Sequence, residues 1–207
     1  MTSKIWDFWA NKYHKLWVQK YSLKPTRDYI LKAISKSSLK KQNSKVLDLG
    51  CGPGELIGLI QKEYPDFQIM GIDYSKEMIK VSKEKNSQAI HKCMDAAELN
   101  SLTEDFDLII CTHSLPYYKS TEKVIAELYR LLKDDGTLLM GFASGNSFYD
   151  KFCLSFVKLT TGPANYPSDL QFRELVKEYF EITETGIIKK KFFMPRIAIY
   201  TLRKVKY

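Results

Sequence analysis

The segment Val46–Glu55 constrains the fold of this chain more than any other part of its sequence. An apolar run closes around Asp48, and glycines then stand at positions 50, 52 and 54, where a helical pattern begins. A strand, a tight turn and a helix in this order are typical of a nucleotide-type cofactor site on an open α/β sheet. Glycine suits such a turn because a backbone without Cβ lets a ligand approach closely. A glycine-rich turn without a ligand is the structural alternative.

Glu55 narrows the type of cofactor. In a dinucleotide-binding loop the corresponding residue is small, so that the helix packs closely and its N-terminus receives a pyrophosphate. Glu55 would place a carboxylate there, and a carboxylate repels a pyrophosphate. The sequence therefore disfavours a nicotinamide-dependent oxidoreductase.

Apolar runs alternate with amphipathic segments from about residue 45 to the end of the chain. We expect strands at 46–49, 68–72, 89–93, 106–111, 137–142, 182–185 and 198–202. We expect helices at 55–64, at 76–85 with Ser75 as N-cap, around 124–132 and at 170–179, the third ended by a turn at 134–136. This alternation predicts an α/β protein with a doubly wound, mostly parallel sheet of seven strands, an antiparallel last strand and helices on both faces.

Two regions exceed a minimal sheet-and-helix core. Aromatic residues recur at spacings of three and four from Trp6 to Tyr21 and predict a helix. A second aromatic region, 143–168, separates the fifth strand from the next helix. We therefore divide a single domain, 1–207, into an N-terminal helical cap (1–44), a cofactor-binding core (45–142), a lid or acceptor insertion (143–168) and a C-terminal helix with strands (169–207).

Over residues 45–142 the chain resembles the class I S-adenosylmethionine-dependent methyltransferases, which have a Rossmann-like fold. Asp48–Gly54 matches the family's E/D-x-G-x-G-x-G motif, and Gly71–Ser75 and Met94–Ala97 resemble two further motifs. Phe106–Ile110 and Leu131–Leu138 are most similar to the small ubiquinone/menaquinone-biosynthesis methyltransferase-like group. The Leu-Lys-Pro-Gly-Gly turn of that group stands here as Leu-Lys-Asp-Asp-Gly. The Asn-Pro-Pro-Tyr signature of amine-methylating relatives is missing after the fourth strand.

The resemblance assigns residues to the adenosine half of S-adenosylmethionine. Asp73, 25 residues after Asp48, would accept both ribose hydroxyls. Asp95 and the backbone of Ala96 would bind adenine by hydrogen bonds, and an ordinary turn aspartate is the alternative for Asp95. Tyr74 and Met78 would contact the adenine ring, although Met78 could equally be a core residue.

The resemblance assigns the methionine half to the glycine loop and its surroundings. Backbone groups of the loop would bind the carboxylate and ammonium, and Asp48 would orient the loop or pair through water. Thr112 would contact the methionine moiety, and Tyr13 matches a family tyrosine that touches the cofactor. The loop residues concerned are Gly50, Cys51, Gly52 and Gly54.

The implied reaction is an in-line displacement on the sulfonium methyl group, which leaves S-adenosylhomocysteine. His113, at the carboxyl end of the fourth strand, is the best-placed general base if the acceptor must lose a proton. A hydrogen-bonded structural histidine is the alternative. His14 is a weaker candidate, and His91 is expected to be structural. The aromatic lid regions favour a small hydrophobic or aromatic acceptor.

Composition limits the other classes of function. The formal net charge is +8, but the lysines are spread through the chain, so a solvated surface is favoured over nucleic-acid binding. Four scattered cysteines suggest no metal or disulfide framework and favour the cytoplasm. We expect no membrane span or signal peptide, and a monomer or homodimer. An RNA or protein methyltransferase and a cofactor-binding protein without transfer activity are the alternatives.

Overall fold

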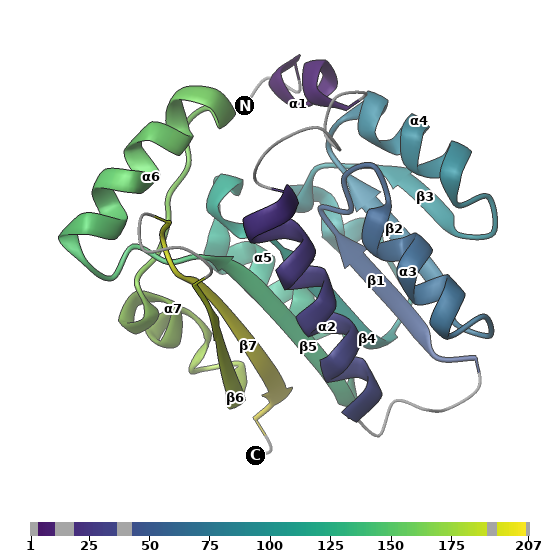
Figure 1. Cartoon of the computed structure of the whole chain (residues 1–207). Helices are drawn as coiled ribbons and strands as arrows, with labels where there is room; N and C mark the ends of the chain where they lie inside the picture. The colour runs from purple at the N-terminus through teal and green to yellow at the C-terminus, as the bar shows by residue number, and fades with distance from the viewer. Residues whose placement is uncertain (1–3, 11–18, 37–42, 190–193, 206–207) are drawn as a thin grey trace.

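A seven-stranded sheet organises the computed structural model, which describes residues 4–10, 19–36, 43–189 and 194–205. The strands lie in the order β3-β2-β1-β4-β5-β7-β6 (Figure 1). They span β1 Lys45–Leu49, β2 Gln68–Asp73, β3 Ile90–Cys93, β4 Phe106–Thr112, β5 Leu132–Ala143, β6 Phe180–Ile188 and β7 Ile197–Lys204. β7 is antiparallel to both of its neighbours, and the other neighbouring strands are parallel. The predicted fold class is confirmed.

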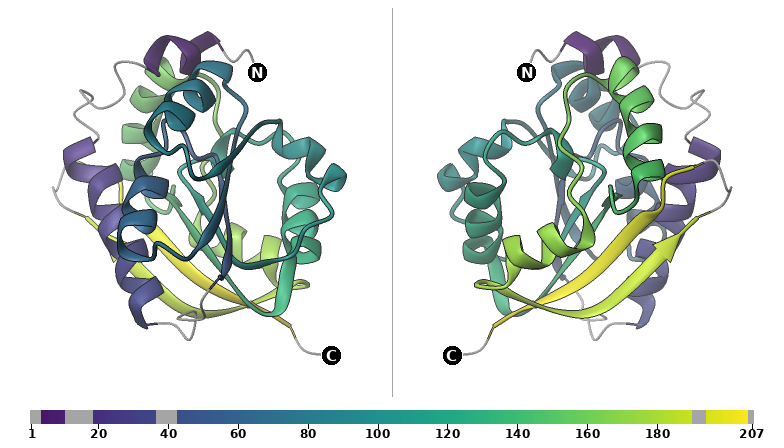
Figure 2. Two further views of the ribbon diagram at one scale, coloured as in Figure 1. Left: turned by 90° about the vertical axis from the view of Figure 1, so that its right-hand side faces the viewer. Right: turned by 90° about the vertical axis from the view of Figure 1, so that its left-hand side faces the viewer.

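Helices cover both faces of the sheet (Figures 1 and 2). The α-helices are α1 Lys4–Trp9, α2 Lys24–Lys36, α3 Glu55–Glu63, α4 Lys76–Lys85, α5 Thr121–Leu131, α6 Phe148–Thr161 and α7 Asp169–Val176. Short helical turns are η2 Gln19–Leu23, η3 Ala96–Ser101 and η4 Leu115–Tyr117. Among the described helices, none is long and apolar enough to cross a bilayer.

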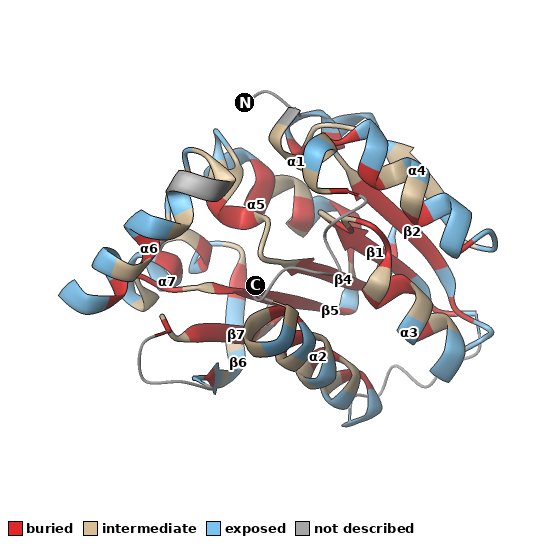
Figure 3. Ribbon diagram, turned by 45° about the horizontal axis from the view of Figure 1, so that its top comes forward, coloured by how far each residue is buried: buried red, intermediate tan, exposed pale blue. Residues whose placement is uncertain are grey.

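The sheet separates two apolar cores, because alternate residues of each strand point to opposite faces. Leu47 of β1 packs with α5 and α7, whereas Val46 packs with α2 and α3. Figure 3 shows the central strands as buried and the outer faces of the helices as exposed. The strand order reverses between β1 and β4, the place where open α/β sheets bind their ligands.

Two predicted boundaries after β4 are wrong. α5 ends at Leu131 and β5 begins at Leu132, whereas a turn at 134–136 and a strand from 137 were expected. Leu132 pairs with Phe106, and the next pair joins Thr137 to Leu108, so residues 133–136 bulge out of the ladder. The turn residues are therefore accommodated within a strand rather than between a helix and a strand.

The lid regions contain helices that the sequence patterns did not delimit. The insertion holds α6, which begins at a reciprocal capping box between Ser147 and Asp150. In the N-terminal region α1 ends at Trp9, and Tyr21 lies in η2, just before α2. The part of the predicted aromatic helix at 11–18, with Tyr13 and His14, lies outside the described residues.

Candidate functional site

The glycine loop leaves the carboxyl end of β1 with all three glycines at positive φ. A Cβ on Gly50 would lie 2.4 Å from the Ser114 Cβ, so this position is fixed by packing. A Cβ on Gly52 would meet no atom within 4 Å, although its φ of 53° disfavours other residues. The backbone at Gly52 is thus left open to a ligand.

Asp73 joins this loop to the end of β2. One carboxylate oxygen accepts from the Gly52 N–H at 2.8 Å and the other from the Ser75 N–H at 2.9 Å. Burial raises the pKa of Asp73, while these backbone donors oppose that shift. Asp73 is held in one orientation before any ligand binds.

A first cavity of about 950 Å³ opens beside the loop, at the carboxyl ends of β1, β2 and β4. It brings together nine residues that the sequence analysis assigned to the site: Gly50, Gly52, Asp73, Tyr74, Met78, Asp95, Ala96, Thr112 and His113. The Asp95 carboxylate also caps η3, by accepting from the Ala97 N–H at 2.9 Å. Met78 is almost fully buried, and Tyr74 is 44% exposed.

A second cavity, of about 800 Å³, lies on the other side of Trp6, His113 and Tyr117, which line both cavities. Trp6 packs edge-on against Tyr117, and the Tyr117 and Tyr166 hydroxyls are 3.1 Å apart. The remaining lining residues carry no charge; they are Ser22, Leu23, Pro116, Ala143, Leu154, Val157, Thr161, Tyr166, Met194, Pro195 and Ile197.

A third, smaller cavity reaches the outer side of the loop and holds Asp48, Cys51 and Arg27. Asp48 is 2% exposed, and no hydrogen-bond partner reaches its Oδ2 atom within the described part of the chain. Burial and the nearby Asp73 carboxylate raise the pKa of Asp48 to about 7. Burial also raises the pKa of the Cys51 thiol, which therefore stays protonated at neutral pH.

His113 lines all three cavities. Its φ of 60° is unusual for a residue with a side chain, and its N–H donates to the Gly141 carbonyl at 2.6 Å. Its Nε2 lies 3.0 Å from the Thr26 hydroxyl, which donates its own proton to the Ser22 carbonyl. The Thr26 oxygen must therefore accept from Nε2–H, which leaves Nδ1 of the neutral ring without a proton. Burial, with a smaller effect of Arg27, lowers the pKa of His113 to about 4.

Comparison with known proteins shows that this chain is similar to methyltransferases. Residues 47–140 match the model of a family described as methyltransferase domain. A malonyl-[acyl-carrier protein] O-methyltransferase of Priestia megaterium is 30% identical over 150 residues, 71% of this chain and 54% of that protein. Over this region the chain is similar to methyltransferases of class I. It spans about half the length of the curated relatives it matches first.

Solved methyltransferases share the fold of the whole chain. The magnesium protoporphyrin IX methyltransferase of Synechocystis with bound S-adenosylmethionine has a TM-score of 0.72 and 19% identity, over 99% of this chain and 98% of that one. The N-methyltransferase NodS of Bradyrhizobium japonicum, in complex with S-adenosylhomocysteine, has a TM-score of 0.72 and 18% identity, over 91% of each chain. The cofactor of this methyltransferase class is S-adenosylmethionine.

Two observations test whether this site fits that cofactor. The space at Gly52, which a Cβ would fill, gives a ligand access to backbone N–H and carbonyl groups. The unpartnered Asp48 oxygen is the type of group that a cationic ammonium would satisfy, directly or through water. Both features suit the methionine end of the cofactor.

Gly54, which was assigned to the site, and His91, which was expected to be structural, both lie away from the described cavities. Gly54 lines none of the three, and a Cβ there would lie 2.3 Å from both Asn86 Nδ2 and Ser82 Oγ. Packing alone thus accounts for glycine at position 54. His91 accepts from Ser82 and donates to the Ala89 carbonyl, in keeping with a structural role.

Several residues that line the three cavities were not predicted. Arg27 follows η2, Tyr118 follows η4 and donates to Ser114 at 2.9 Å, and Met194 precedes β7. Only the folded chain brings these segments together. The Ser-Phe-Tyr-Asp sequence at 147–150, a capping signature, could have located α6 and so the cavity wall that it forms.

Proposed function

We propose that this protein transfers a methyl group from S-adenosylmethionine to a small, apolar or aromatic acceptor. The observation that carries the proposal is the junction of the two larger cavities at Trp6, His113 and Tyr117. One cavity holds the glycine loop and the acids at the ends of β2 and β3, and the other is lined by uncharged side chains. This arrangement would put a donor and an acceptor on either side of a shared wall.

In the proposed complex the first cavity receives the adenosine half of the cofactor. Asp73 would accept the ribose hydroxyls with the lone pairs that its two backbone bonds leave free. Asp95 would accept from the adenine amine with the oxygen that does not cap η3, and Ala96 would donate its N–H. Tyr74 and Met78 would contact the ring.

The methionine half would extend toward the third cavity. Asp48 would pair with the ammonium, and Arg27 would offer a cation to the carboxylate. The backbone of the glycine loop and the Thr112 hydroxyl would complete this end of the site. Tyr13 keeps its proposed contact with the cofactor, although it lies outside the described residues.

When bound, S-adenosylmethionine supplies a methyl group that an acceptor lone pair takes while the carbon–sulfur bonding pair stays on sulfur. His113 would meet the acceptor proton with Nδ1, because Nε2 already carries its own proton. Its lowered pKa makes the ring a weak base, so it would take a proton from an acidic acceptor and only orient a less acidic hydroxyl. Trp6 and Tyr117 would hold water away from the reacting atoms.

The second cavity supports the acceptor class. Its described lining residues include no ionised side chain, and burying a charge without a partner is costly. The polar groups are hydroxyls such as those of Tyr117 and Tyr166, which suit an acceptor with one or two hydroxyl or carbonyl groups. The acceptor would enter beneath α6, in keeping with the proposed lid at 143–168.

We infer one domain over 1–207, divided as described above, which acts as a monomer or homodimer. All four cysteines are free thiols, which supports a reducing compartment such as the cytoplasm.

A thermal-shift panel tests the donor. S-Adenosylmethionine and S-adenosylhomocysteine at 100 times their dissociation constants should stabilise the protein by about 2.7 kcal/mol. That corresponds to a rise in Tm of about 5–11 °C for a chain of this size. NAD and NADP should give no shift. Asp73→Asn should abolish the response to the sulfur nucleosides, whereas Asp66→Asn, at an exposed position before β2, should keep it.

A transfer assay then tests the acceptor. Radioactive methyl groups from S-adenosylmethionine should appear in the apolar fraction of a small-molecule extract. Label in RNA or protein would contradict the acceptor class. Binding of the sulfur nucleosides without transfer to any fraction would indicate a binding protein, and a shift with NAD alone would overturn the donor.

A further inference from the structure

We propose that the outer face of α6 binds an anionic lipid surface. Four large side chains on this helix are exposed: Phe148 by 89%, Tyr149 by 42%, and Phe152 and Phe156 by 57% each. The three phenylalanines are four residues apart, so they lie along one side of the helix. Phe152 and Phe156 pack edge-on against each other and leave most of their ring surface to solvent.

Only the inner side of α6 packs against the rest of the described chain at the second cavity. Leu154 is 2% exposed and lines the second cavity with Val157 and Thr161. The aromatic side chains on the other side contribute nothing to that wall. Contiguous exposed apolar surface of this kind marks an interaction site.

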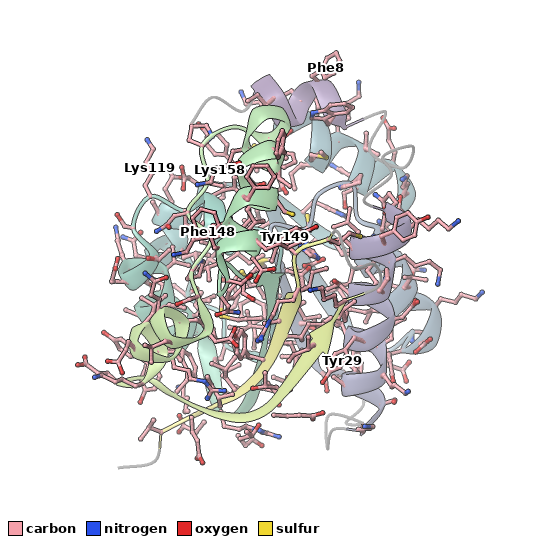
Figure 4. All side chains as sticks on the ribbon, turned by 60° about the vertical axis from the view of Figure 1, so that its left-hand side comes forward. Phe8, Tyr29, Lys119, Phe148, Tyr149 and Lys158 are labelled. Carbon is pink, nitrogen blue, oxygen red and sulfur yellow. The ribbon has the colours of Figure 1, made fainter. Side chains whose placement is uncertain are left out.

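The charges on α6 select the partner. The helix contains one acid, Asp150, which is buried in the capping box with Ser147. Its cations are Lys151, which is exposed, and Lys158, whose ammonium lies 5.9 Å from the centre of the Tyr166 ring. Figure 4 shows Lys158 with Phe148 and Tyr149 on the side of the molecule that α6 presents.

Aromatic rings beside lysines are typical of a helix that lies in the plane of a membrane interface. The rings enter the boundary between headgroups and acyl chains, while lysines extend toward anionic phosphates. The net charge of +8 adds a general attraction to an anionic surface. A second copy of the chain would bring Lys151 and Lys158 toward equally charged side chains, so the lysines favour lipid over self-association.

Such docking would place the second cavity next to the bilayer, because α6 is both its wall and the docking helix. An apolar acceptor concentrates in a bilayer, and this consequence rests on the proposed function. The binding itself does not, since it requires neither cofactor nor acceptor.

Vesicle co-sedimentation of the full chain, without cofactor, tests the proposal. The protein should bind vesicles of phosphatidylcholine mixed with phosphatidylserine, and high salt should weaken this binding. Binding to phosphatidylcholine alone should be weaker. The double variant Phe152→Ser/Phe156→Ser should lose about tenfold or more in affinity, since it removes two exposed rings. Lys151→Glu/Lys158→Glu should strongly reduce the preference for phosphatidylserine.

Ile90→Ser is the matched control, because Ile90 is 56% exposed on β3, at the opposite edge of the sheet from β6. This variant should bind like the unmodified protein. Circular dichroism checks that each variant is folded. If the double serine variant does not fold, the double glutamate variant tests the proposal by itself. No vesicle binding, or binding that the α6 variants leave unchanged, would overturn the proposal. A dimer in solution that Phe152→Ser dissociates would also overturn it, by assigning the face to self-association.

Discussion

At the scale of single residues, Asp48 combines burial, an unpartnered oxygen and a position against the glycine loop. Its neighbours on β1 are apolar, and its side chain points toward the face that α2 and α3 cover. An ionised carboxylate there lacks the solvation that water would provide. Asp48 therefore destabilises the ligand-free protein, and this is consistent with a residue kept for binding a cation.

The pKa of Asp48 predicts how stability depends on pH. The folded protein holds this proton up to about pH 7, whereas an unfolded chain releases it near pH 3.8. The free energy of unfolding should thus fall as the pH rises from about 4 to 7. Asp48→Asn should remove this loss and gain at least about 1 kcal/mol at pH 8, or about 2–4 °C in Tm, with little gain at pH 4. Thermal denaturation of the ligand-free protein at both pH values measures the difference.

The effect of His113 on the pH dependence of stability is opposite to that of Asp48, and it provides a check on the Asp48 prediction. Its pKa falls from 6.5 to about 4 on folding, so acidification through this range destabilises the protein. In the Asp48→Asn variant the acid side of the profile should therefore steepen. An equal gain at pH 4 and pH 8 would mean that Asp48 is not buried as a carboxyl group.

Residue patterns could predict the acids and glycines of the site, because each follows directly from the end of a strand. Asp73 and Asp95 line the first cavity for this reason. Arg27 could not be placed, because its segment precedes the first strand and only tertiary packing brings it to the loop. Trp6 was expected in the lid as part of the N-terminal aromatic stripe, and it lines the first cavity. His113 was placed, but its left-handed backbone and tautomer depend on contacts with Gly141 and Thr26.

At the scale of elements, Ser75 links two helices. Its hydroxyl accepts from the Met78 N–H at 3.1 Å, which caps α4, and donates to Asp7 of α1 at 2.5 Å. One buried side chain thus fixes the start of α4 and holds α1, which carries Trp6, over the first cavity.

Replacing this cap should weaken both links. Ser75→Ala should destabilise the protein by about 1 kcal/mol through the lost cap, or about 2–4 °C in Tm. It should also lower the affinity for S-adenosylmethionine, because α1 loses its bond to α4. Calorimetry measures both effects. Ser35→Ala, at an exposed position on α2, is the control and should change neither; a Ser75→Ala variant with unchanged Tm would contradict the role of the cap.

Hydrophobic periodicity predicted the strands and helices of the core closely, since their burial requires it. It failed where the pattern is ambiguous. The Asp-Asp-Gly sequence at 134–136 is typical of a turn, yet pairing with β4 continues on both sides of it. α6 has exposed aromatic residues on its outer side and Leu154 and Val157 on its inner side, so its apolar residues do not form a single stripe and only the capping box marks its start.

At the scale of the whole molecule, the strands of the sheet differ in how far they are buried. β4 and β5 are buried along most of their lengths, whereas β3 is exposed or partly exposed throughout and most of β6 faces solvent. Both exposed strands lie at the edges of the sheet.

Hydrogen exchange should follow this order. Amides of β1, β4 and β5 should exchange slowest, through global unfolding, and those of β3 and β6 faster, through local opening. Mass spectrometry of exchanged peptides measures these rates. Protection of β3 equal to that of β4 would contradict the expected order.

The wall at Trp6, His113 and Tyr117 has a consequence for how such a protein can diversify. These residues come from three separate segments: α1, the end of β4 and η4. Every other described residue that lines one of the two larger cavities is absent from the lining of the other. Substitutions in α6 or before β7 can therefore reshape the second cavity while the loop side stays intact. The fold separates the choice of what is modified from the supply of what is transferred.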